Sequence, residues 1–108
     1  MSEELASPPT PVRKTPPPRR VHEVIEFRHD GQRYRGSVSY VDDKPIEVFL
    51  EGGKNGSPLQ AMARDCAVAT SLALQYGVPF ELLRQTLTRN EAGAPVGPLG
   101  AFLDQVIP

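Results

Sequence analysis

The stretch that decides the fold is Val21–Glu51, which reads VHEVIEFRHDGQRYRGSVSYVDDKPIEVFLE. Apolar and polar residues alternate over 22–29, 32–41 and 46–51, and this alternation is typical of strands with one buried face. Asp30-Gly31 separates the first two parts with residues that tolerate positive φ, as a two-residue hairpin turn requires. We therefore predict a three-stranded antiparallel meander.

The two turns also predict which residues pair across the sheet, because turn length sets the register of a hairpin. On the apolar face the expected pairs are Phe27 with Tyr34, Ile25 with Gly36, Val38 with Val48 and Tyr40 with Ile46. On the charged face Arg35 is expected opposite both Glu26 and Glu51. That face also carries Arg28, Arg33 and Glu47. We expect its charges to compensate one another and the face to be solvated.

Start signals for a long helix follow the sheet, at Ser57-Pro58-Leu59-Gln60. A serine N-cap, a proline in the first turn and a glutamine that closes a capping box predict a helix over 58–76, ended by Gly77. Its expected buried stripe is Leu59, Met62, Ala63, Cys66, Ala69 and Ala73, widened by Val68 and Leu72. Pro79 and Pro98 start two further helices. The predicted fold is α+β, β-β-β-α-α-α, with the helices on one face of the sheet.

Composition limits the domain organisation and the classes of function. The chain has 108 residues, a net charge of −1 and 12 prolines, six of which lie in residues 8–18. We predict a disordered Pro-rich basic tail over 1–20, with a polyproline ligand at 16–18 as the alternative to a plain tether, and one domain over 21–108. The charge does not favour nucleic acid. No apolar run approaches the roughly 20 residues of a membrane span, and no signal peptide is recognisable, so we expect a cytoplasmic protein.

Residues of catalytic or ligand-binding type are few and scattered. Cys66 is the single cysteine and lies on the predicted buried stripe, so we expect an inert core thiol. His22 and His29 fall on opposite faces of the first strand and cannot share a metal ion. Thr70 and Ser71 have no histidine at helical spacing to activate them. We therefore expect no catalytic residue, no metal and no cofactor.

The connection between sheet and long helix is the one candidate binding site. Gly52 is followed by Gly53, Lys54, Asn55, Gly56 and Ser57, which are the candidate anion-binding residues. A flexible backbone before a helix N-terminus can direct several N–H groups at a phosphate, although the spacing is not that of a P-loop. The alternative is a tight connection that requires glycine conformations.

Three segments resemble the TSCPD domain found near the C-terminus of adenosylcobalamin-dependent ribonucleotide reductases. They are Gly53-Lys54-Asn55-Gly56-Ser57-Pro58, Ser71-Leu72-Ala73-Leu74-Gln75-Tyr76-Gly77-Val78-Pro79 and Gly97-Pro98-Leu99. The resemblance covers about residues 19–107, although Thr-Ser-Cys-Pro-Asp itself is absent.

The resemblance implies a stand-alone accessory or interaction domain linked to deoxyribonucleotide metabolism. The catalytic barrel and the reactive cysteines of the reductases are absent, so no catalysis by this chain itself is expected. The implied partner is a ribonucleotide reductase or another protein, and exposed sheet edges allow a homodimer. The alternative is a small protein that binds a nucleotide or phosphate at the Gly-rich connection.

Overall fold

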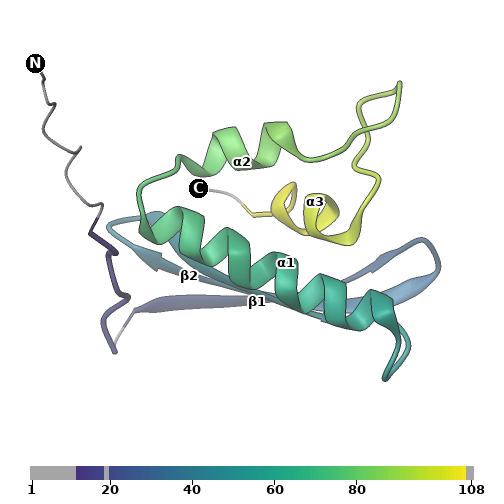
Figure 1. Ribbon diagram of the computed structural model, residues 1–108, viewed down its shortest axis with the longest axis horizontal. Helices are drawn as coiled ribbons and strands as arrows, with labels where there is room; N and C mark the ends of the chain where they lie inside the picture. The colour runs from purple at the N-terminus through teal and green to yellow at the C-terminus, as the bar shows by residue number, and fades with distance from the viewer. Residues whose placement is uncertain (1–11, 19, 107–108) are drawn as a thin grey trace, which may run out of the picture.

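The computed structural model describes residues 12–18 and 20–106 and has the predicted α+β fold. Its elements are β1 Val21–His29, β2 Gln32–Val41, β3 Lys44–Gly52, α1 Pro58–Gln75, α2 Phe80–Thr86 and α3 Pro98–Leu103. The strands form one antiparallel sheet in the order β1-β2-β3. The three helices lie on the same side of this sheet (Figure 1).

Two tight turns set the register of the sheet. Asp30 and Gly31 have φ of 51° and 75°, and Asp42 and Asp43 have φ of 53° and 62°, so both residues of each turn are left-handed. This conformation matches the twist of the flanking strands in two-residue hairpins. The predicted pairs of β1 with β2 are confirmed, as are the pairs of Val38 with Val48 and Arg35 with Glu51.

One predicted pair is wrong: Tyr40 lies opposite Pro45 rather than Ile46. The turn at 42–43 aligns Val41 with Lys44, which is one residue out of step with the pairing beyond Ser39. A β-bulge absorbs the extra residue. Pro45 and Ile46 are consequently both buried, although they are consecutive in the strand.

The core lies between the sheet and the helices, with residues of α1, α2 and α3 in one cluster. Phe102 is fully buried and its ring stacks on Phe27 with centroids 6.0 Å apart, while Phe27 stacks on Tyr34 at 5.6 Å. Gly36 lies directly beneath Phe102, because a Cβ built on it would come within 2.7 Å of Phe102 Cζ. Glycine at this position therefore permits the ring to approach the backbone of β2.

The long helix begins and ends as predicted, but its buried face is not the predicted stripe. Ser57 is the N-cap, and Gly77 follows the C-cap with a φ of 99°. The buried residues of α1 are Ala63, Ala67, Thr70, Ser71, Leu74 and Gln75. Of the predicted stripe only Ala63 is among them, so the helix is rotated relative to the prediction.

Hydrogen bonds to the free edge of β3 explain this rotation. The Ser71 hydroxyl accepts from Val48 N and donates to Val48 O, both at 2.9 Å. Gln75 Nε2 donates to Ile46 O at 3.3 Å. Buried backbone groups on an edge strand require partners, and the small polar face of α1 supplies them.

Part of the predicted tail contacts the domain. Lys14 N donates to Gln75 O at 2.7 Å, Arg13 Nε donates to Gln75 Oε1, and Arg20 forms an ion pair with Glu47 at 2.7 Å. Residues 1–11 and 19 of the predicted tail lie outside the described residues. The division into a tail over 1–20 and a domain over 21–108 stays a prediction. None of the described helices has the length and apolarity that a membrane span needs.

Candidate functional site

The rotation of α1 leaves an apolar surface in solvent, which we call the outer face of α1. It consists of Leu59, Met62, Cys66, Val68, Leu72 and Tyr76. Met62 is 61% exposed, Val68 50% and Tyr76 48%. Single exposed apolar residues are ordinary, but a group of them along one helix is a candidate interaction surface.

Cys66 belongs to this outer face and is exposed, so its predicted role as a core thiol is wrong. The prediction failed because apolar residues occupy both sides of α1, so the spacing of apolar residues does not identify the buried side. The spacing of Ala63, Ala67, Ser71 and Gln75 at steps of four residues was the available signal for the inner face.

The outer face continues over the edge of the sheet onto its opposite side. Val68 and Arg64 of α1 line a shallow concavity of about 360 Å³ with Phe49 of β3, whose side chain is 50% exposed. Arg64 and Asp65 are the charged residues that interrupt the apolar surface. A rigid 18-residue helix thus presents a largely apolar surface to solvent.

The Gly-rich connection brings the five predicted anion-binding residues together at one end of the sheet. Gly53 and Gly56 have φ of 78° and 73°, so the connection requires glycine conformations. Three of its backbone N–H groups bond within the protein: Gly53 N donates to Arg33 O, Ser57 N to Lys54 O, and Gly56 N to Gln60 Oε1.

The remaining side chains of the connection leave its binding role open. Ser57 Oγ accepts from Gln60 N at 3.2 Å, as predicted for the N-cap. The Gln60 side chain bonds Gly56 N and Asn55 Oδ1 rather than Ser57 N, so the predicted capping box is not closed. Lys54 and Asn55 are exposed. Anion binding by Gly53, Lys54, Asn55, Gly56 and Ser57 stays a prediction.

Glu81, Arg84, Arg89 and Asp104 form a separate, structural network of ion pairs. Asp104 accepts hydrogen bonds from Arg89 and Arg84, and the bond from Arg89 is the main reason that the pKa of Asp104 lies below its usual value. Burial, with a hydrogen bond to Glu23, raises the pKa of Tyr40 to about 12. Among the described residues no cluster of three or more His, Cys, Asp or Glu is placed to hold a metal ion.

Comparison with known proteins gives a consistent result. The TSCPD domain family matches residues 8–107. Vitamin B12-dependent ribonucleotide reductases of Streptantibioticus cattleyicolor and Streptomyces coelicolor are each 43% identical over 72 residues, which is 66% of this chain. The reductase of Bradyrhizobium diazoefficiens is 37% identical over 65 residues, or 58% of this chain.

The matched region is a small part of each relative. This chain covers 12%, 7% and 5% of the length of the three reductases. No solved structure matches the chain significantly. Since the family match spans nearly all of the described residues, the chain belongs to the TSCPD domain family and is related to one region of the vitamin B12-dependent ribonucleotide reductases.

Proposed function

We propose that this protein is a non-catalytic interaction module of deoxyribonucleotide metabolism, which binds a ribonucleotide reductase chain through the outer face of α1. The observation that carries the proposal is the exposed apolar surface of Leu59, Met62, Cys66, Val68, Leu72 and Tyr76. Methionine and tyrosine are enriched at protein interfaces, where they supply large apolar contact areas.

The relatives support a reductase as the occupant of this face. In them the related region is joined to a chain many times longer, which belongs to a vitamin B12-dependent ribonucleotide reductase. A domain carried on a large protein can bury an apolar helix face against it. Through its apolar helix face, this chain can likewise bind a reductase from which the region that matches this chain has been removed.

Binding to two forms of a vitamin B12-dependent ribonucleotide reductase tests the proposal. One form is full length, and the other lacks the region that matches this chain. We expect calorimetric binding to the truncated form and weaker binding to the full-length form, in which the enzyme's own domain competes. Met62→Glu and Leu72→Glu each place a charge in the outer face, so each weakens binding at least about tenfold. Leu82→Glu is the matched control, because Leu82 is 54% exposed on α2.

Cys66 provides a second readout without a substitution in the face. Its exposed thiol is expected to react readily with an alkylating reagent in the free native protein, and the truncated reductase is expected to slow this reaction. Binding to neither form of the reductase contradicts the proposal. Equal effects of Met62→Glu and Leu82→Glu, or unprotected Cys66 in a stable complex, show that the outer face of α1 is not the contact surface.

A further inference from the structure

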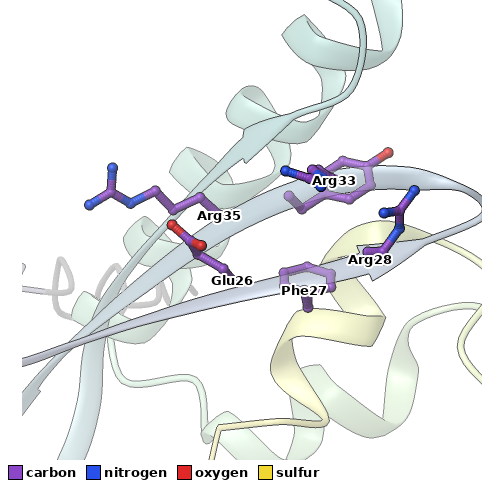
Figure 2. A pocket seen from close by; sticks show the side chains of 6 residues that line it. Glu26, Phe27, Arg28, Arg33 and Arg35 are labelled. Carbon is purple, nitrogen blue, oxygen red and sulfur yellow. The ribbon is translucent and has the colours of Figure 1, made fainter.

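The β1–β2 hairpin carries two arginines directly opposite each other near its turn. Arg28 of β1 pairs with Arg33 of β2, and Arg35 follows on the same face of β2, opposite Glu26. Figure 2 shows these four side chains on the two neighbouring strands, with Glu26 beside Arg35. The net charge of this group is therefore positive, and the excess lies toward the turn.

No described carboxylate forms an ion pair with Arg28 or Arg33. Like charges directly opposite each other in a sheet are destabilising. Arg20, Arg84 and Arg89 each form ion pairs with carboxylates. Over 12–18 and 20–106, no hydrogen bond or ion pair engages the guanidinium groups of Arg28 and Arg33, and the same holds for Arg35 and Arg64. What distinguishes Arg28 and Arg33 is that they lie directly opposite each other.

The arginines surround a hollow in the surface. A concavity of about 400 Å³ is lined by Glu26, Phe27, Arg28, Arg33, Tyr34 and Arg35 (Figure 2). Phe27 packs on Phe102 on the helix side, so the alternation of β1 places Arg28 on the opposite, open side of the sheet. The hollow is therefore accessible when the helix side of the molecule is covered.

We propose that this concavity, which we call the hairpin site, binds a small anion that carries a triphosphate group. Arg28 and Arg33 would each contact one of two adjacent phosphates. Guanidinium groups form paired, charge-assisted hydrogen bonds with phosphate oxygens. Binding offsets the repulsion between the two arginines, which are held at one place by the hairpin. Lys54 adds a cation at the same end of the sheet, because Gly53 N is bonded to Arg33 O.

The size and charge of the face favour a small anion over a nucleic acid. A nucleic-acid site usually extends as a basic stripe across a basic protein. Here the net charge is −1, and Glu26, Glu47 and Glu51 lie on the same face as the arginines. The inference goes beyond the proposed function, since the hairpin site and the outer face of α1 are different surfaces.

Titration with inorganic triphosphate tests the hairpin site on the full chain. We expect binding at submillimolar concentration by calorimetry, and a rise in melting temperature because the ligand binds only the folded state. Arg28→Gln and Arg33→Gln each weaken binding about tenfold or more, since each removes one charged phosphate contact. Arg64→Gln, at an exposed arginine of α1, leaves the affinity unchanged and is the matched control. Melting of each variant without ligand verifies that it folds.

Three results overturn the proposal. The first is no binding of triphosphate at millimolar concentration. The second is loss of binding in Lys54→Ala with normal binding in Arg28→Gln and Arg33→Gln, which assigns the anion to the Gly-rich connection. The third is tighter binding of a single-stranded oligonucleotide than of triphosphate, lost in the same arginine variants, which assigns the face to nucleic acid. None of these results affects the test of reductase binding.

Discussion

Gly36 shows at the scale of one residue how closely the sheet and α3 pack. It pairs with Ile25 on one side and Leu50 on the other, and it lies beneath the fully buried ring of Phe102. The ring occupies the space that a side chain at this position would need. The sequence pattern placed Gly36 on the apolar face but could not reveal that a distant aromatic ring lies above it.

We expect Gly36→Ala to destabilise the protein by about 1–3 kcal/mol, because the added methyl group overpacks a well-filled core. The free energy of unfolding is measured by urea denaturation. Ser37→Ala is the control: Ser37 is the next residue of β2, is half-buried, and faces the opposite side. If Gly36→Ala unfolds at the same urea concentration as the native protein, the packing of Phe102 on β2 is wrong.

At the scale of elements, α1 and β3 are joined by polar contacts as well as by apolar packing. The Ser71 hydroxyl satisfies both the N–H and the C=O of Val48, and Gln75 reaches Ile46 O. These bonds close the free edge of β3, which is otherwise a template for pairing with another chain. They also fix which of the two apolar sides of α1 faces away from the sheet.

Removal of the Ser71 hydroxyl tests this arrangement. Ser71→Ala leaves two buried backbone groups of Val48 without their partner, so we expect a loss of about 1–3 kcal/mol of stability. The amide of Val48 is also expected to exchange its hydrogen faster, which NMR measures directly. Ala69→Ser makes a change of similar size on the exposed side of the same helix and should alter stability by no more than about 0.5 kcal/mol. Equal effects of the two substitutions contradict the contact.

At the scale of the whole molecule, the segment before β1 is tied to both layers of the fold. Arg13 and Lys14 bond to Gln75 near the end of α1, and Arg20 pairs with Glu47 of β3. Pro-rich composition predicts disorder because such a segment has little apolar surface to bury. Its described contacts are instead hydrogen bonds and an ion pair, which composition does not reveal.

Deletion of residues 1–20 is compared with deletion of 1–11, so that the difference reports residues 12–20, the segment that makes the described contacts. Hydrogen bonds of this kind contribute about 0.5–1.5 kcal/mol each. We therefore expect the longer deletion to melt at least about 4 °C below the shorter one. Equal melting temperatures show instead that the segment is a flexible tail throughout, as its composition predicts.

The candidate sites could be predicted from sequence only in part. The arginines of the hairpin were correctly predicted to lie on one face. The pairing of Arg28 with Arg33 suggests a binding site only once the structure shows that neither has a partner among the described residues. The donors around Gly53 and Gly56 were expected to face a ligand, but the structure engages them with Arg33 and Gln60. Whether a backbone N–H group is free to bind a ligand depends on hydrogen-bond partners elsewhere in the chain, and sequence periodicity carries no information about these partners.

The features that could be predicted from the sequence arise from local interactions. Asp30-Gly31, the Ser57 cap and the alternation of the strands act over a few residues, so they specify the meander, most of its register and the bounds of α1. The tertiary structure decided which side of α1 is buried. Both sides carry apolar residues, and the buried side is the one on which Ser71 and Gln75 bond the backbone of the β3 edge.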